Sequence, residues 1–180
     1  GTFGKSYGLS TSGCDGPCEA GFYCPPASVT ATQHRCGGPH VFCPQGSAVP
    51  NPVRSGYYTF SHFVPEAVCE SGPCNVMPPP TDIHSDEHQC ELGHYCVNGT
   101  RYICPAGTFG GSWGLVNASC SGQCREGYYC PAQSHIPTQL ECGSAAVFCP
   151  RGSSIPTAVS RGYFSSDGGA PPTLRHVEVS

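Results

Sequence analysis

Two stretches of this chain, residues 14–47 and 120–153, are copies of one another, and the rest of the sequence is arranged around them. When residues 1–60 are placed on residues 107–166 at a constant offset of 106, no gap is needed and 29 of the 60 positions are identical. A fixed internal period is typical of repeat architectures, in which each unit packs mainly against its neighbours. The chain is therefore expected to fold as a tandem array.

The positions that the copies share serve the backbone and its cross-links. Many are glycines, which allow positive φ, and others are aromatic residues that form a thin apolar filling. Positions that differ are mostly polar or charged, such as Glu19 against Arg125. All five cysteines coincide: Cys14 with Cys120, Cys18 with Cys124, Cys24 with Cys130, Cys36 with Cys142 and Cys43 with Cys149. The repeat preserves a shape rather than a chemistry, and we expect no enzyme activity, cofactor or metal.

The composition indicates a disulfide scaffold made in an oxidising, extracellular compartment. The chain has 15 Cys, 24 Gly and 19 Pro, and only 11% of its residues are charged. Zinc is disfavoured because the spacings are CxxxC and CxxxxxC rather than paired CxxC knuckles. A net charge of −4 argues against nucleic acid, and the absence of a long apolar run argues against membrane insertion. Nine Tyr and eight Phe, many at repeated positions, argue against disorder.

The chain divides into four predicted parts. Residues 1–60 are a first repeat that lacks its N-terminal portion, 61–89 a variable joint, 90–166 a second repeat, and 167–180 the start of the next joint. The joint contains a private pair, Cys69 and Cys74, expected to close a small loop, and a stiff proline run at 78–80. This phasing predicts that the natural polypeptide continues in both directions.

Short extended segments are expected at 21–24, 41–43 and 56–60, separated by Gly and Pro turns. No window shows sustained helical periodicity. The predicted fold class is a small disulfide-rich protein of elongated tandem repeats, with short β-hairpins and little or no helix.

The ordered motifs CxxGxYC, CPAGTFG, CxxxCxxGYYCP and CGxxxVFCPxGS, followed by GYY or GYF, resemble the ephrin-receptor-like, or GCC2/GCC3, cysteine-rich repeats. Those repeats are similar in style to the disulfide modules of tumour necrosis factor receptors. The resemblance covers nearly the whole chain apart from the joint. It implies rod-forming extracellular modules, of the kind found in long tandem arrays on protist surfaces, and it transfers no catalytic residue.

Cysteine spacing alone leaves the disulfide connectivity open. A first-to-third, second-to-fourth rule, which is similar to that of the receptor modules, pairs Cys18 with Cys36, Cys24 with Cys43, Cys90 with Cys104, Cys96 with Cys120, Cys124 with Cys142 and Cys130 with Cys149. Cys69 then takes Cys74, and Cys14 remains unpaired within the chain. Its expected partner is the counterpart of Cys96, before Gly1. A free thiol and a bond to another molecule are the alternatives for Cys14.

Two N-glycosylation sequons begin at Asn98 and Asn117, both in polar loops, where covalent glycans are expected. Three other patterns have competing interpretations. Two histidines and three acids at 82–88 are either a metal site or, preferably, a solvated joint. The CxxxC pairs are either redox centres or, preferably, structural disulfides. The exposed aromatics Tyr7, Tyr57, Trp113 and Tyr163 either contact partners or are covered by neighbouring loops.

The leading functional hypothesis is a glycosylated extracellular structural protein, whose partners are copies of itself or adjacent repeats, and which builds a filament, fibre or surface coat such as a flagellar hair or cell-wall fibril. The alternative is a receptor-like extracellular binding module that uses the joint as its ligand loop. A secreted inhibitor or toxin fits the cysteines but not the tandem phasing.

Overall fold

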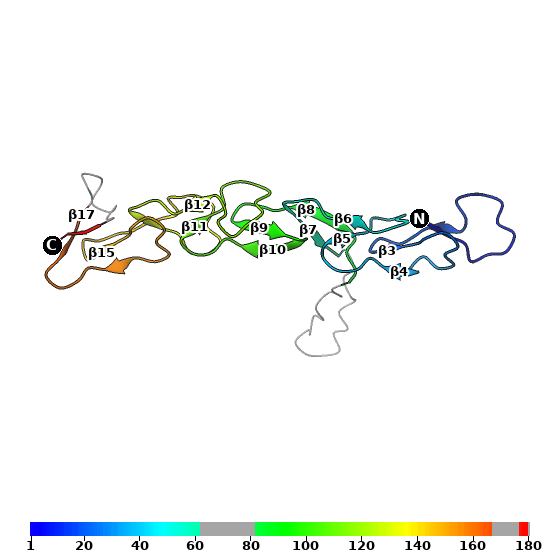
Figure 1. Cartoon of the computed structure of the whole chain (residues 1–180), viewed down its shortest axis with the longest axis horizontal. Helices are drawn as coiled ribbons and strands as arrows, with labels where there is room; N and C mark the ends of the chain where they lie inside the picture. Colours follow the sequence, from blue (N-terminus) through cyan, green and yellow to red (C-terminus); the bar gives the residue numbers. More distant parts are fainter. Residues whose placement is uncertain (62–81, 167–176, 180) are drawn as a thin grey trace, which may run out of the picture. The chain divides into compact units, whose positions relative to one another are not determined.

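The computed structural model describes residues 1–61, 82–166 and 177–179, and in these ranges the chain forms short strands and no helix (Figure 1). The predicted fold class, a small disulfide-rich chain of short hairpins without helix, is confirmed for this part of the sequence. No helix of the described residues meets the length and apolarity that a membrane span requires. The expected Cys69–Cys74 loop and the proline run at 78–80 lie outside the described residues.

The described strands pair into nine two-stranded sheets, each of which we call a rung. In chain order the rungs are β1 (Thr2–Phe3) with β2 (Gly16–Pro17), β3 (Phe22–Tyr23) with β4 (His34–Arg35), β5 (Val41–Phe42) with β6 (Asn51–Pro52), β7 (Tyr57–Phe60) with β8 (Asp86–Gln89), β9 (His94–Val97) with β10 (Thr100–Ile103), β11 (Thr108–Phe109) with β12 (Gly122–Gln123), β13 (Tyr128–Tyr129) with β14 (Leu140–Glu141), β15 (Val147–Phe148) with β16 (Thr157–Ala158), and β17 (Phe164–Ser166) with β18 (Val177–Val179). The extended segments expected at 21–24, 41–43 and 56–60 coincide with β3, β5 and β7.

A short sequence pattern begins most rungs. A glycine precedes the first strand, and the second strand residue is aromatic, as in the Gly-x-aromatic sequences that start at Gly1, Gly21, Gly56, Gly107 and Gly127. Aromatic residues favour extended backbone because they pack well on a pleated surface. The register is the same in both copies: Thr2 faces Pro17 as Thr108 faces Gln123.

The same two backbone hydrogen bonds recur at the glycine of successive rungs. The glycine carbonyl accepts from a cysteine amide: Gly1 from Cys18, Gly21 from Cys36, Gly93 from Cys104, Gly107 from Cys124 and Gly127 from Cys142, at 2.8–2.9 Å. The glycine amide donates to a carbonyl further along the chain: Gly1 to Cys24, Gly21 to Cys43, Gly93 to Gly110, Gly107 to Cys130 and Gly127 to Cys149, at 2.7–2.9 Å. These bonds satisfy backbone groups that a fold with such short strands would otherwise leave without partners.

A five-residue turn, Cys-Pro-x-x-Ser or Cys-Pro-x-x-Thr, repeats along the chain. In four of its five occurrences it lies in the loop that joins the two strands of one rung, and the fifth, at 104–108, leads from β10 to β11. The hydroxyl of its last residue donates to the proline carbonyl: Ser28 to Pro25, Ser47 to Pro44, Thr108 to Pro105, Ser134 to Pro131 and Ser153 to Pro150, at 2.6–2.7 Å. The four serines are buried. Proline fixes φ at the second position of each turn, and the fourth position has positive φ, so five consecutive residues define the chain reversal. The fourth-position residues are Ala27, Gly46, Gly107, Gln133 and Gly152.

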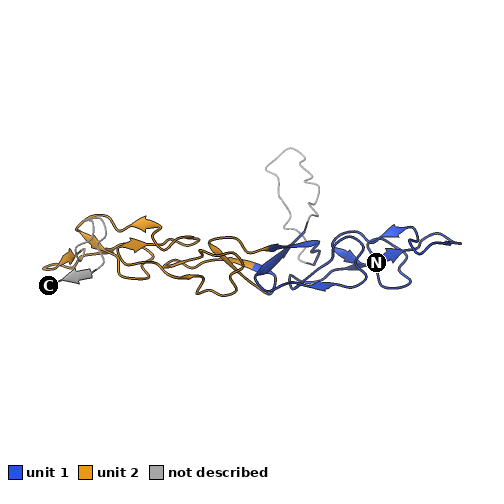
Figure 2. Ribbon diagram, turned by 90° about the horizontal axis from the view of Figure 1, so that it is seen from above, with its two compact units in different colours: residues 1–88, 98–100 blue, residues 89–97, 101–180 orange. Residues whose placement is uncertain are grey.

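The buried interior consists almost entirely of disulfides. Among the described residues, Ile83 is the one apolar side chain other than cysteine that is buried, and eleven cysteines are no more than 4% exposed. The chain divides into two compact units, Gly1–His88 with Asn98–Thr100, and Gln89–Val97 with Arg101–Ser180 (Figure 2). Rungs of two-residue strands contain too little apolar surface to be held by hydrophobic burial alone, so covalent links replace it.

The twelve described cysteines that were predicted to form disulfides do so, but the predicted partners are wrong in every case. The bonds are Cys18–Cys24, Cys36–Cys43, Cys90–Cys96, Cys104–Cys120, Cys124–Cys130 and Cys142–Cys149, with S–S distances of 2.00–2.14 Å. They replace the expected Cys18–Cys36, Cys24–Cys43, Cys90–Cys104, Cys96–Cys120, Cys124–Cys142 and Cys130–Cys149.

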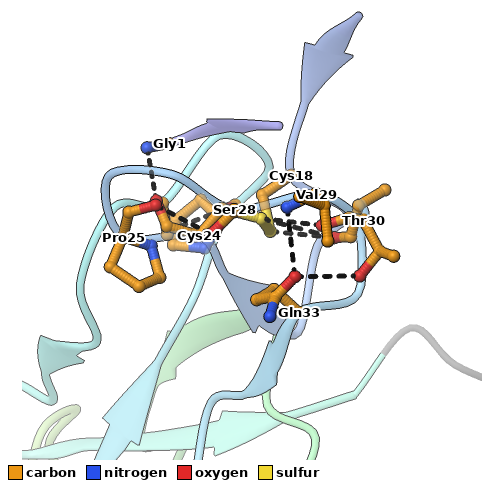
Figure 3. The surroundings of a disulfide bond; sticks show 11 residues. Gly1, Cys18, Cys24, Pro25, Ser28, Val29, Thr30 and Gln33 are labelled. Carbon is orange, nitrogen blue, oxygen red and sulfur yellow. Dashed lines mark hydrogen bonds between the residues drawn. A yellow bond between two sulfur atoms is a disulfide. The ribbon is translucent and has the colours of Figure 1, made fainter. Parts of the chain in front are cut away.

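The hairpin register explains this correction. In the second rung Phe22 faces Arg35 and Tyr23 faces His34, so residue 21 lies opposite residue 36 and residue 24 opposite residue 33. Cys18 is therefore out of register with Cys36, whereas the turn at Gly21 brings Cys18 to a Cα–Cα distance of 5.8 Å from Cys24 (Figure 3). That distance lies within the usual range for a disulfide.

Candidate functional site

Cys14 is the one free cysteine among the described residues, and it is exposed. It was predicted to be unpaired within the chain, and the structure agrees for the part that it describes. Its amide donates to the Thr11 carbonyl at 3.1 Å, and the residue has a left-handed backbone with φ of 49°. A non-glycine residue held at positive φ needs support from its surroundings, and the hydrogen bond to Thr11 is one such support.

Asp15, the next residue, closes the loop that leads to Cys14. Its carboxylate accepts hydrogen bonds from the Ser6 amide at 2.7 Å, from the Ser6 hydroxyl at 2.8 Å, and from the Lys5 amide. These bonds, the Ser6 amide first, hold the pKa of Asp15 below its usual value. In the second copy a serine, Ser121, takes the same place and accepts from the Gly111 amide at 2.9 Å.

The CxxxC pairs are not dithiol centres. Cys18 is bonded to Cys24, while Cys14 is free. In the second copy the CxxxC pair is Cys120 and Cys124, and these two are not bonded to one another: Cys120 is bonded to Cys104 and Cys124 to Cys130. The arrangement at these positions is that of structural cross-links.

The first sequon lies at the tip of the β9–β10 hairpin. Asn98 is exposed and has φ of 48°, and Gly99 follows with φ of 77°. Two successive positive φ values characterise the tight hairpin turn for which Asn-Gly is the preferred sequence. Asn98 is exposed at this turn, whereas Gly99 is buried and its carbonyl accepts a hydrogen bond from the Thr59 amide at 3.0 Å.

The second sequon lies on the loop that the Cys104–Cys120 bond closes. Asn117 and Ser119 are both exposed, and the Asn117 Oδ1 atom accepts a hydrogen bond from the Ser119 amide at 3.0 Å. This Asx-turn orders the sequon while both residues stay exposed. Both predicted acceptor asparagines are thus accessible to a modifying enzyme.

The acids and histidines at 82–88 take part in separate contacts. Asp82 forms an ion pair with Arg35 at 2.9 Å, and the hydrogen bond from Arg35 lowers the pKa of Asp82. Glu87 forms an ion pair with Arg54. His88 stacks on Phe60 with ring centroids 4.3 Å apart. No group of three metal-ligating side chains gathers in the described part of the chain.

The exposed aromatics differ between the copies. Tyr7 is fully exposed, whereas its counterpart Trp113 is 59% exposed. Tyr163 is 49% exposed. Tyr57 is half-buried, with the Arg54 guanidinium 3.9 Å from its ring centroid. Tyr7, in the loop between Gly4 and Asp15, is therefore the aromatic that the described fold covers least.

Comparison with protein-family models, with curated proteins and with solved structures finds no match to this chain. The assignment of function depends on the geometry of the repeat itself.

Proposed function

We propose that this chain belongs to a glycosylated extracellular structural protein, whose units build a filament, fibre or surface coat. The observation that carries the proposal is the recurrence of one cross-linked rung: the same strand pair, the same glycine hydrogen bonds and the same proline turn return along the chain. Each additional rung contains its own stabilising bonds and needs no larger core. Such a design suits extension by repetition.

The disulfides support the extracellular assignment. The six described disulfides involve twelve cysteines, of which eleven are buried, and the described residues have almost no other apolar interior. Disulfides of this kind form and persist in the secretory pathway and outside the cell, where thiols are not kept reduced.

The sequons support the glycan component of the proposal, since Asn98 and Asn117 are exposed on ordered turns. Expression through a eukaryotic secretory pathway is expected to yield a protein whose mass falls on treatment with an N-glycosidase. Asn117→Gln should remove one glycan and Asn98→Gln the other. An unchanged mass in the unsubstituted protein would contradict this component.

The polymer component is tested by negative-stain electron microscopy of the native material under non-reducing conditions. Filaments with a regular axial repeat are the expected result. Isolated short particles at every concentration would contradict the structural proposal and favour the receptor-like module, whose ligand would then be sought. The resemblance to ephrin-receptor-like repeats is compatible with either outcome.

A further inference from the structure

In the second copy, a half-module at 90–104 is attached to the loops of the following rung, and its residues 90–97 and 101–104 belong to the same compact unit as those loops. Four backbone hydrogen bonds and one disulfide make the attachment. They are Gly93 N to Gly110 O at 2.8 Å, Gly114 N to Cys90 O at 2.8 Å, Cys96 N to Leu115 O at 2.8 Å, Gln133 N to Cys104 O at 2.9 Å, and the Cys104–Cys120 bond.

The first copy has the same receiving atoms without an occupant. The counterparts of the five receiving residues are Gly4, Gly8, Leu9, Cys14 and Ala27, which we call the open socket. Within the described residues, no hydrogen bond engages the carbonyls of Gly4 and Leu9 or the amides of Gly8 and Ala27, and Cys14 has no disulfide. The socket therefore carries four unused backbone groups and one thiol.

The open socket already has the conformation of the occupied one. Its φ angles match those of the second copy: 49° at Cys14 and 51° at Cys120, 74° at Gly8 and 73° at Gly114, 70° at Ala27 and 69° at Gln133. The internal bonds match as well, since Gly4 N donates to Ser28 O at 2.9 Å and Gly110 N to Ser134 O at 2.9 Å. A partner would meet a surface that needs no rearrangement, which lowers the entropic cost of binding.

Part of the socket borders a hollow. A hollow of about 360 Å³ is lined by Gly1, Gly4, Cys14 and Ala27 among others. In the second copy a Cβ atom on Gly110 would lie 2.8 Å from Cys104 Sγ and 2.9 Å from Gly93 N, so glycine is required by the occupant. At Gly4, by contrast, the nearest atom to such a Cβ is the flexible end of Leu9 at 3.0 Å.

We propose that the open socket binds a half-module of the Cys90–Ala106 kind from the same polypeptide, and that Cys14 forms a disulfide with its third cysteine. That cysteine would lie three residues before Gly1, as Cys104 lies three residues before Gly107. The Gly1 nitrogen, here the N-terminal ammonium group, donates to Cys24 O at 2.8 Å, and the Gly107 peptide nitrogen donates to Cys130 O at 2.8 Å, so the two nitrogens occupy equivalent places in the two copies. The sequence had indicated the counterpart of Cys96 instead.

The bond forms by thiol–disulfide exchange. The third cysteine first forms a mixed disulfide with a small-molecule disulfide, which releases one thiol. The Cys14 thiolate then attacks the sulfur of that cysteine, and the second small thiol leaves and takes up a proton. Two protein thiols are oxidised by two electrons, and one disulfide oxidant is reduced to two thiols. The inference deepens the proposed function, and rests on it, because it assumes that such modules follow one another.

The test extends the 180-residue chain by placing a copy of residues 89–106 directly before Gly1, and refolds the protein in a glutathione redox buffer. Peptide mapping without reduction should find Cys14 bonded to the third added cysteine. The amides of Gly8 and Ala27 should exchange hydrogen at least about tenfold more slowly than in the unextended chain, because both gain backbone acceptors. Cys14 that still reacts with iodoacetamide, that pairs with another added cysteine, or that links two chains would overturn the proposal.

Two variants separate socket binding from mere tethering. Changing the third added cysteine to serine should leave Cys14 reactive but retain slow exchange at Gly8. Gly4→Ala should leave the unextended chain folded and impair bond formation in the extended chain, because its Cβ would meet the incoming sulfur. Unimpaired bonding in Gly4→Ala, in a chain whose unextended form folds, would contradict the socket. If the extended chain does not fold, a second experiment uses the unextended chain and a synthetic 89–106 peptide whose third cysteine is activated as a mixed disulfide. Cys14 should form a disulfide with this peptide, and failure to do so would equally overturn the proposal.

The two proposals fail separately. Correct pairing of Cys14 without filaments in the electron microscope would reject the structural polymer and keep the socket. Filaments in which Cys14 is still reduced would reject the socket and keep the structural polymer.

Discussion

Removing one local disulfide tests both the connectivity and its contribution to stability. The double substitution Cys124→Ala and Cys130→Ala deletes a bond with a sequence separation of 6, whereas Cys104→Ala and Cys120→Ala delete one with a separation of 16. Loop-closure entropy gives a loss in the free energy of unfolding of about 2.3 kcal/mol for the short loop and about 3 kcal/mol for the long one. Alanine keeps both sites apolar, so the difference reflects mainly the covalent link.

The assay combines urea unfolding, followed by near-ultraviolet circular dichroism, with thiol counting under denaturing conditions. In the observed pairing the short-loop variant adds no free thiol, because Cys142 and Cys149 are bonded to one another. With first-to-third pairing, both would lose their partners. Two additional thiols, or a short-loop variant less stable than the long-loop variant, would refute the reasoning.

Three further substitutions test the Cys-Pro-x-x-Ser turns and the loop between Gly4 and Asp15. Ser134→Ala removes the hydroxyl that donates to the Pro131 carbonyl at 2.7 Å and should lower the free energy of unfolding, measured in urea, by about 1 kcal/mol. The control Ser112→Ala, at an exposed serine, should change it by no more than about 0.5 kcal/mol. Ala27→Gly relieves a φ of 70° and should raise stability by up to about 1 kcal/mol; destabilisation would show that the methyl group is needed. The pKa of Asp15 in the folded chain is below the usual 3.8, so its contribution to the free energy of unfolding is present above that value and is lost as the pH falls through the lowered pKa. Asp15→Asn should therefore flatten the dependence of thermal stability on pH between about pH 2 and 5. An unchanged dependence on pH would contradict this.

Much of the fold follows from the sequence because its signals are local. The duplication gives the period, Gly and Pro give the turns, and the short extended segments at β3, β5 and β7 lie where aromatic residues follow glycine. The Cys-Pro-x-x-Ser turn is also written in five consecutive residues, and comparison of Cys24 to Ser28 with Cys130 to Ser134 would have revealed it. Both copies repeat these signals, which makes them easy to distinguish from chance.

The disulfide pairing could not be predicted because it depends on register. In four of the six described bonds, a cysteine that follows the second strand of a rung bonds to the cysteine that follows the first strand of the next rung, as Cys18 after β2 bonds to Cys24 after β3. The same holds for Cys36 after β4 and Cys43 after β5. Spacing alone does not show where two-residue strands begin and end, so it does not distinguish this rule from first-to-third pairing. The open socket was missed for the same reason.

The two kinds of cross-link have different consequences for assembly. The short loops, with separations of 6 or 7, bring their two cysteines together by a local turn, so each can close as soon as its own residues are made. The Cys104–Cys120 bond instead requires the half-module to be seated on the Gly110–Cys120 loop, because its cysteines are 16 residues apart. Formation of the Cys104–Cys120 bond therefore indicates that the half-module is packed on the following loop, whereas the short-loop bonds indicate only local folding. Cys14 is the first-copy counterpart of Cys120, with φ of 49° against 51°, and this correspondence is why we propose that the Cys14 thiol also receives a half-module.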